Sequence, residues 1–565
     1  MRKKYILGGF LLSLLLLTGC SKDNTPTTVK SLPFHNYNNY YDIEAETLDT
    51  YYVGDSLVPY VSVSNYIKSM NGFLDSSKYS CSASPFFSEY VVKTEYSGVP
   101  LSIVFDYKND RILSSYDFAF LNTVNIADTI DYSFNLSTKT KEYYNGKTII
   151  FDLAKYDFDM RYINGNCLVP FQIINALFGG QNYNSTYYTG NSYYNTYFSL
   201  AATKNGQEVL QKMKNDTASN LDNEELRESN YNYLCFLFDY FYGLKETKGI
   251  ESFDSYIGRD IKNKLLSTNA DEYTKGYASI VQKLNELHTS FHNKAYNASI
   301  NISFVEGEFE TSNFKIHKNT LNDLTEKAKV LYGDELKNQI QIVDNTCYIF
   351  FEGFDTGNNA NVKDASGNIL NDAYLYDTYY LFYKALEDIK NNNQIKNIVV
   401  DLSINGGGNA GAQYRALGFL TKSFDISSRN ALTKLASTST IKVDTNNDGL
   451  YDESDDYSDK YNWYILTSVC SYSSANLFAH LAKKNNSNVK LIGEKAGGGG
   501  CSILPVIGID GTALQISGIN QNVTLTGNGT SYNYTILEDG PEVDYELDYN
   551  YFYDRNYLTN YINNL

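Results

Sequence analysis

The sequence is poor in several residue types, and each shortage narrows the possible fold classes. Its 565 residues include only 8 prolines, 1 tryptophan and 5 histidines. A chain with so little proline is not a collagen-like fibre, and 42% of apolar residues excludes a chain that is disordered throughout. The length exceeds what one compact core usually holds, so we expect a multidomain protein.

Positive charge is also scarce. Lys and Arg number 47 against 65 Asp and Glu, a formal net charge of −18. Such a chain repels phosphate backbones, which argues against nucleic acid as a partner. Tyrosine, with 53 residues, is abundant. It fits either a sticky aromatic surface or a general bias in composition.

The first twenty residues predict export. Three basic residues at 2–4 precede an apolar stretch at 6–17, and Leu-Thr-Gly-Cys at 17–20 resembles the site at which a lipoprotein signal peptide is cut. We therefore expect a signal peptide at 1–19, a lipid on Cys20, and a polar tether at 20–34 that holds the protein on the outward face of a bacterial membrane. The alternative is an uncleaved membrane anchor.

Cysteine spacing does not indicate a metal site. Six cysteines follow Cys20, widely spaced and without a CxxC pair, so no zinc site is predicted and disulfide pairing stays open. They are Cys81, Cys167, Cys235, Cys347, Cys470 and Cys501.

Three regions follow the tether. Residues 35–204 predict an α+β region with two weakly related repeats, because Leu-Val-Pro-Tyr at 57–60 and Leu-Val-Pro-Phe at 168–171 each join an alternating stretch to an apolar run. Residues 205–292 have helical periodicity, and the last predicted helix ends near His288. Residues 293–560 alternate strands with helices, which predicts a mostly parallel sheet.

Three motifs in this last region carry candidate chemistry. A buried strand at 398–402 runs into three glycines at 406–408, whose bare N–H groups suit an oxyanion. The stretch lacks a Lys-Ser or Lys-Thr after the glycines, which argues against a nucleotide-binding P-loop. A serine cluster at 471–474 opens a helix, where it serves either as a nucleophile or as an ordinary N-cap. A third strand at 489–492 ends in a glycine-rich loop at 497–500.

In this order, the motifs resemble the C-terminal-processing (tail-specific) and tricorn-core serine peptidase family. The matching stretches are 401–408, 471–479, 493–498 and 540–544, within a resemblance that covers about residues 275 to 550. It implies an α/β crotonase-like fold, Ser473 as the nucleophile, and an oxyanion site made by the N–H groups of Ser474 and of Gly406 or Gly407.

A departure from the family bears on the catalytic base. Members with a Ser/Lys dyad carry the lysine where this chain has Gly499, and Lys495 lies four residues too early. The tricorn-like branch takes a histidine from a Leu-x-x-x-His-Thr segment, which implies His288 here, in 284–289. The family's glutamate three residues after the nucleophile is Asn476. The carboxylate that orients His288 is left open between Glu538 and Glu542.

The resemblance thus implies an exported serine endopeptidase that cleaves proteins or peptides by a Ser-His mechanism, with no cofactor for catalysis. The alternative is a catalytically degenerate lipoprotein on the same fold that binds peptides or cell-wall fragments. His292 would complete an HxxxH zinc pair with His288, but the Glu of HExxH is missing.

A separate acidic stretch at 444–455 has the spacing of a calcium loop. Oxygen-bearing side chains stand at positions 1, 3, 5, 9 and 12 and a glycine at position 6, which predicts a structural Ca²⁺. The predicted ligands are Asp444, Asn446, Asp448, Leu450 through its carbonyl, Asp452 and Asp455. A solvated acidic turn is the alternative.

Overall fold

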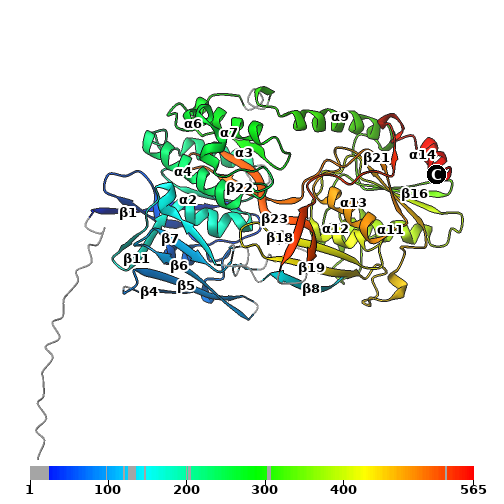
Figure 1. Ribbon diagram of the computed structural model, residues 1–565, viewed down its shortest axis with the longest axis horizontal. Coiled ribbons are helices and arrows are strands. Elements are labelled where there is room, and N and C mark those ends of the chain that lie inside the picture. The colour runs from blue at the N-terminus through cyan, green and yellow to red at the C-terminus, as the bar shows by residue number, and fades with distance from the viewer. Residues whose placement is uncertain are drawn as a thin grey trace, which may run out of the picture.

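The structure is a computed structural model (Figure 1). It describes residues 25–565 except 85, 97, 117, 119–120, 122, 125–134, 145–147, 199, 201–204, 302–306 and 528–530. The predicted signal peptide and Cys20 lie outside these residues. Within them the strands form four sheets. No helix in this part of the chain combines the length and apolar character needed to span a bilayer.

The N-terminal region holds two sheets. The seven-stranded sheet has the order β10-β11-β3-β2-β1-β13-β12, and the five-stranded sheet the order β4-β5-β6-β7-β9. The strands of the first are β1 (Thr27–Asn36), β2 (Thr47–Val53), β3 (Tyr60–Ser62), β10 (Arg161–Ile163), β11 (Asn166–Pro170), β12 (Asn184–Tyr188) and β13 (Tyr193–Tyr197). Those of the second are β4 (Ser80–Ser84), β5 (Glu89–Tyr96), β6 (Val99–Asp106), β7 (Arg111–Ser114) and β9 (Ile149–Asp152).

The predicted tether at 20–34 is too long. Strand β1 begins at Thr27 and pairs with both β2 and β13. Leu32 and Phe34 point into the core and are buried. Since these residues bury apolar side chains in a sheet, at most the stretch before Thr27 is left to act as a tether.

The two segments with the shared Leu-Val-Pro signature lie side by side. Each joins a strand to a helix, β3 to α1 (Val63–Ser69) and β11 to α2 (Phe171–Ile174). The two strands pair antiparallel, with Val61 opposite Val169. A common origin of the two halves stays a prediction.

Helices follow as the periodicity predicted. They are α3 (Gly206–Asn215), α4 (Glu224–Phe241), α5 (Phe253–Ile257), α6 (Arg259–Leu265) and α7 (Ala270–Leu284). The side chain of Asn223 caps α4, and Glu224 and Glu225 favour its positive end. The last helix ends before the predicted base, since Asn285 adopts a left-handed conformation after Leu284. His288 therefore lies in a loop and not at a helix end.

The C-terminal core contains the predicted parallel sheet, in the order β15-β16-β17-β20-β21-β25. All its neighbours from β16 to β25 pair parallel, whereas β15 is antiparallel. Its strands are β15 (Gln339–Val343), β16 (Thr346–Phe350), β17 (Asn397–Asp401), β20 (Asn462–Thr467), β21 (Val489–Gly493) and β25 (Tyr545–Glu546).

Helices cover both faces of this sheet, as continuous apolar strands require. Alternate side chains of β16 divide between the faces. Cys347 and Ile349 pack with α11 (Thr378–Ile389), α12 (Ala410–Leu417) and α13 (Ser474–Asn485). Tyr348 and Phe350 pack with α9 (Ser312–Tyr332) and α14 (Arg555–Asn563). The remaining short helices are α10 (Asn359–Val362), η1 (Ser76–Lys78), η2 (Leu153–Tyr156), η3 (Asn175–Gly179), η4 (Gly180–Asn182), η5 (Ala373–Leu375), η6 (Glu453–Asp455) and η7 (Tyr549–Tyr551).

An antiparallel sheet ties the regions together. Its path is β14-β23-β18-β19-β8, and β22 and β24 also pair with β23. The strands are β8 (Leu136–Tyr144), β14 (Ser290–Asn293), β18 (Phe424–Asn430), β19 (Ala436–Val443), β22 (Cys501–Ile507), β23 (Ala513–Gly527) and β24 (Tyr532–Ile536). Strand β8 belongs to the predicted N-terminal region and β14 to the predicted helical segment, but both pair with strands of the C-terminal region in this one sheet. The predicted boundaries at 204/205 and 292/293 therefore do not separate independent bodies.

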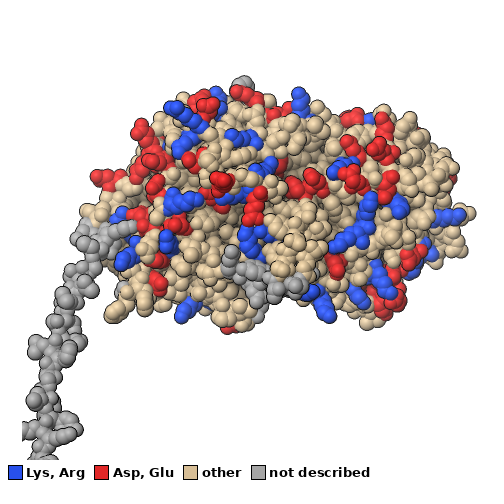
Figure 2. Space-filling view, viewed as in Figure 1, with Lys and Arg blue, Asp and Glu red and all other residues tan. Residues whose placement is uncertain are grey.

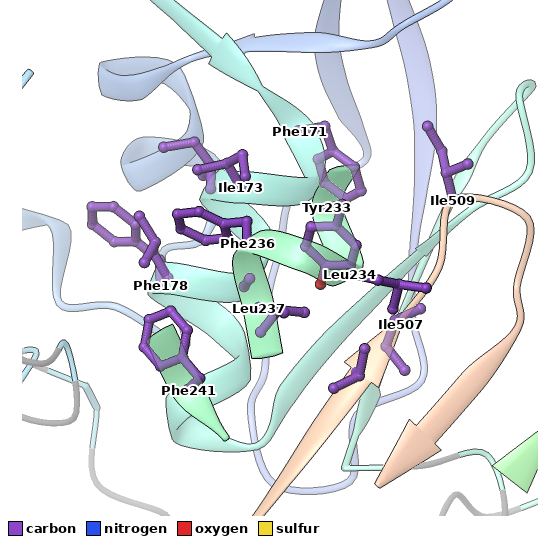
Figure 3. Packing of buried hydrophobic residues seen from close by; sticks show 14 of the residues in the cluster. Phe171, Ile173, Phe178, Tyr233, Leu234, Phe236, Leu237, Phe241, Ile507 and Ile509 are labelled. Carbon is purple, nitrogen blue, oxygen red and sulfur yellow. The ribbon is translucent and has the colours of Figure 1, made fainter. Parts of the chain in front are cut away.

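The buried side chains also form one cluster that spans the predicted regions. One cluster of buried residues includes Leu32 in β1, Phe236 in α4 and Ile507 in β22. Figure 3 shows side chains from α2, α4 and the β22–β23 region meeting in this cluster. The chain is thus a multidomain α/β protein with shared interfaces, and the crotonase-like class of its core stays a prediction.

Candidate active site

Ser473 stands at the start of α13 in an uncommon backbone conformation. Its φ is 54° and its ψ is −118°, which a residue with a side chain adopts only at a cost in strain. The conformation is held by its N–H, which donates to the Gly498 carbonyl at 2.7 Å, and by its carbonyl, which accepts from Leu477 N at 2.9 Å. The side chain makes no capping hydrogen bond. Ser473 is therefore not an ordinary N-cap, and its Oγ is free for another role.

His288 lies in the same cleft as Ser473. The cleft has a volume of about 840 Å³, and residues of both predicted motifs line it. The imidazole is only 5% exposed, and among the described residues its Nδ1 has no hydrogen-bond partner. Burial lowers the pKa of His288 from its usual 6.5 to about 4. The ring is therefore neutral at pH 7, as a general base must be.

The glycine loop packs directly on the serine. A Cβ on Gly407 would lie 2.8 Å from Cβ of Ser473, so only glycine allows this approach. Both glycine N–H groups that were candidates for the oxyanion site are already engaged: Gly406 donates to the Glu352 carbonyl at 3.2 Å and Gly407 to Asn405 Oδ1 at 2.9 Å.

The next glycine offers the free amide. Phe354 and Gly408 form a parallel β-bridge: the Phe354 N–H donates to the Gly407 carbonyl, and the Phe354 carbonyl accepts the Asn409 N–H. In this pattern the N–H of Gly408 points away from Phe354. Within the described chain neither the Gly408 N–H nor the Ser474 N–H has an acceptor. The available pair is thus Gly408 with Ser474: Ser474 is the residue that the sequence predicted, and the glycine lies one or two residues later.

The structure separates the two candidate carboxylates. Glu542 is exposed and pairs with Lys495 at 2.9 Å. Glu538 is partly buried, and its Oε2 accepts the N–H of Gly500 at 2.8 Å. Burial and the nearby Glu286 together raise the pKa of Glu538 from 4.5 to about 7, while the Gly500 hydrogen bond opposes the shift. Neither side chain hydrogen-bonds the imidazole of His288 in this part of the structure.

Glu286 is a residue that sequence reasoning missed. It is buried, and its carboxylate accepts the N–H of His288 at 2.8 Å and the hydroxyl of Thr289, which holds the loop in place. With Glu538 it lines a second hollow, of about 420 Å³, which shares Tyr472 and Leu287 with the cleft. Its place two residues before His288, in the same motif, was the available signal.

Tyr472 fills the space where a dyad lysine would stand. A Cβ on Gly499 would lie 2.8 Å from Cζ of Tyr472 and 3.0 Å from N of Ser473. The same ring contacts the His288 ring edge-on, with centroids 4.8 Å apart. Lys495 is instead on the surface, paired with Glu542. Among the described lining residues of the cleft there is no lysine.

Asn476 replaces the family's glutamate inside the first turn of α13. It is buried, and its Nδ2 donates to the Leu537 carbonyl at 3.0 Å. Its Oδ1 has no partner among the described residues. The side chain thus tethers α13 to the chain segment that precedes Glu538, a structural contact that an amide can make without charge.

The six cysteines after Cys20 are all free. Cys501 lines the cleft, but burial raises the pKa of its thiol, so it is not poised as a thiolate nucleophile. His292 forms a hydrogen bond with Ser290 Oγ at 2.9 Å through its Nε2.

The acidic loop predicted to bind calcium is closed by its own backbone. Asp444 accepts the N–H of Gly449 at 2.8 Å, and Asp455 accepts the N–H of Thr445 at 2.8 Å. Asp452 caps the short helix η6. Within the described residues, no three His, Cys, Asp or Glu side chains are grouped to hold a metal ion. The residues as arranged do not fit a preformed calcium cage, and calcium binding here stays a prediction.

A melting experiment tests the calcium prediction. If the predicted Ca²⁺ binds, the loop carboxylates exchange their backbone donors for the ion, and we expect a higher melting temperature in millimolar calcium than in chelator. A ligand that binds only the folded state would raise it. A rise that is lost in Asp444→Ala would show that the loop rearranges around the ion.

The free serine hydroxyl, the neutral imidazole in its cleft and the two unengaged amides suit attack on an acyl carbon, which is the chemistry of the serine hydrolases. Residues 345–537 match the sequence model of peptidase family S41. The resemblance predicted from the motifs is confirmed, and the chain is a serine-type peptidase homologue.

Solved structures are similar to the chain at low identity. A candidate peptidase from Parabacteroides merdae is 16% identical, covering 57% of this chain and 89% of its own, with a TM-score of 0.36. A lipoprotein from Streptococcus agalactiae is 13% identical, covering 59% and 96%, with a TM-score of 0.32. A photosystem II D1 C-terminal processing protease is 16% identical, covering 36% and 42%, with a TM-score of 0.25. No curated protein matches the chain.

Proposed function

We propose that the protein is an exported serine endopeptidase in which Ser473 and His288 form the catalytic pair. The observation that carries the proposal is that these two residues, predicted from motifs far apart in the sequence, line one cleft. Hydrolysis of peptides by the purified chain, lost in a folded Ser473→Ala variant, is the test.

The proposed reaction follows from the groups in the cleft. Ser473 Oγ attacks the peptide carbonyl while His288 takes the hydroxyl proton, and the N–H groups of Gly408 and Ser474 hold the oxyanion. The imidazolium then gives its proton to the leaving amine. Water, deprotonated by the same imidazole, releases the acyl group and restores the serine.

Two contacts support histidine over lysine as the base. The Tyr472 ring occupies the space next to Gly499, where a lysine would have to pass, and it packs against the imidazole. Lys495 is engaged at the surface with Glu542. We further propose Glu538 as the orienting carboxylate, because it is partly buried and lines the same hollow as Tyr472, whereas Glu542 is exposed.

This assignment predicts a pH profile. If ionised Glu538 steadies the imidazolium, kcat/KM falls as the pH drops through about 7, where that carboxylate takes up a proton. Protonation of His288 alone would remove activity only near pH 4. We expect Glu538→Gln to lower kcat and to move the acid limb of the remaining activity toward pH 4.

Glu542→Gln is the matched control and should keep the parent profile. An acid limb near pH 4 in the parent would rule out Glu538, and activity that rises only at alkaline pH would favour a lysine base.

A second candidate function is binding without catalysis. The unpartnered Nδ1 of His288 and the amide of Asn476 in place of a glutamate favour it, because both weaken the usual support of a catalytic base. Such a lipoprotein would capture peptides or wall fragments. It would bind peptides equally well as parent and as Ser473→Ala, and the parent would leave them intact.

Export and anchoring complete the proposal. The basic, apolar and Leu-Thr-Gly-Cys segments at 2–20 support cleavage before Cys20 and its lipidation. We expect Cys20→Ala to leave the membrane fraction or to accumulate unprocessed, as fractionation and mass measurement would detect. A correctly cleaved variant that stays on the membrane would place the anchor elsewhere.

A further inference from the structure

We infer that the cleft accepts peptide segments without formal charge next to the bond to be cleaved, an inference that rests on the proposed peptidase function and names its substrate class. None of the described residues that line the cleft is Asp, Glu, Lys or Arg. In contrast, 20% of the whole chain is charged, and Figure 2 shows both signs interspersed over the visible face. The neutral lining is thus a local property of the site.

One wall of the cleft is aromatic and comes from the N-terminal sheet. Tyr183 precedes β12, and Tyr197 and Phe198 stand at the end of β13. The Phe198 N–H donates to the Tyr183 carbonyl at 2.7 Å, which joins the two segments. The Phe198 ring also meets the His292 ring edge-on, with centroids 6.1 Å apart. The tyrosine-rich region therefore contributes aromatic side chains to the lining of the cleft.

Polar amide side chains on β23 also line the cleft. Gln515, Gln521 and Asn522 line the cleft. Gln515 donates to the His288 carbonyl at 2.9 Å and Gln521 accepts from Arg429 at 2.7 Å, so both are held in place. The charge of Arg429 is itself balanced by Glu246 at 3.1 Å. The side chain of Asn522 bonds to no other described residue and is left for a ligand.

The uncharged lining is expected to favour neutral over charged substrate side chains, because a charged group pays more free energy to lose its water. A charged side chain that enters the cleft loses water and meets ring faces and amide dipoles but no opposite charge, which is costly. A neutral side chain loses less, and rings and amides can pack against it or hydrogen-bond it. The attraction between a cation and an aromatic ring is weaker than the hydration that the cation loses. Both signs should therefore be disfavoured.

Digestion of a mixed peptide pool tests the inference. We expect mass spectrometry of products from the parent chain to show Asp, Glu, Lys and Arg depleted about tenfold at the two positions flanking the cleaved bond, a factor that corresponds to about 1.4 kcal/mol. Cleavage with charged residues at their frequency in the pool would overturn the inference while leaving the peptidase function intact.

Binding measurements separate the two ideas if no cleavage occurs. Ser473→Ala should bind a neutral peptide about tenfold more tightly than its Gln→Glu and Met→Lys versions. Equal affinities would overturn the inference even if the chain is not a peptidase.

A charge placed in the wall should change this selection. Asn522→Asp, made in the Ser473→Ala background, is expected to improve binding of the Met→Lys peptide relative to the Gln→Glu peptide by about tenfold. Asn533→Asp adds the same charge on the exposed face of neighbouring β24 and should leave the ratio unchanged. An unchanged ratio in Asn522→Asp, or an equal change in Asn533→Asp, would contradict the assignment of this wall.

Discussion

Replacing Ser473 by alanine is expected to lower peptide hydrolysis by at least about 10³-fold while the protein stays folded, because Ser473 alone among the described serines that line the cleft has a positive φ. The substitution removes only the side-chain oxygen and leaves the backbone hydrogen bonds to Gly498 and Leu477 in place. His288→Ala should cost a similar factor. Kinetics on a peptide that the parent cleaves would measure both.

The double variant gives the sharper result. Two groups that transfer one proton act as a unit, so Ser473→Ala with His288→Ala should be about as inactive as either single variant. Ser487→Ala, at an exposed position after α13, is the matched control and should retain parent activity. Activity that survives in a folded Ser473→Ala variant would show that Ser473 is not the nucleophile. If the loss in the double variant equals the product of the two single losses, Ser473 and His288 do not act as one unit.

The second large effect concerns stability. Arg555→Met should lower the free energy of unfolding of the core by about 3–5 kcal/mol, because it leaves the buried carboxylate of Asp401 without its cation. Arg555 Nη2 lies 2.6 Å from Asp401 Oδ2, and the side chains are 3% and 0% exposed. Asp401 ends β17 just before the glycine loop, so this pair joins α14 to the strand that leads into the site.

The sole tryptophan provides the measurement. Trp463 is buried in β20 opposite Ile398 of β17, so its fluorescence during denaturation reports on this sheet. Lys495→Met breaks an exposed ion pair and should leave the transition where it is. Arg555→Met combined with Asp401→Leu should lose less than Arg555→Met alone, since no charge is then stranded. An unchanged transition in Arg555→Met would show that the pair contributes nothing.

Local patterns in the sequence predicted much of the core. The strands and helices around Ser473 and the glycine loop appear where alternating and helical patterns placed them, because each depends on neighbours within a few residues. The family match at 345–537 confirms the resemblance that these motifs carried. The charge deficit and the apolar N-terminal run were likewise plain from composition alone.

Features that depend on distant contacts were not predictable in this way. Strand β1 begins inside the expected tether because its partners β2 and β13 come later in the chain. The different exposure of Glu538 and Glu542, on which the proposal of Glu538 as orienting carboxylate rests, is not visible in their spacing. The unengaged glycine amide beside Ser473 is that of Gly408, because Asn405 and Glu352 accept the N–H groups of the two earlier glycines.

By itself, the sequence determined the class of chemistry, since a serine at a helix start, a glycine loop and one histidine in a matching motif are local signals. Only the tertiary structure decided what surrounds them. It seated Tyr472 beside Gly499, brought the aromatic residues near β12 and β13 to the cleft, and left its described lining without charge. The physical reason is that pKa, solvent access and substrate fit depend on side chains that meet in space from all parts of the chain.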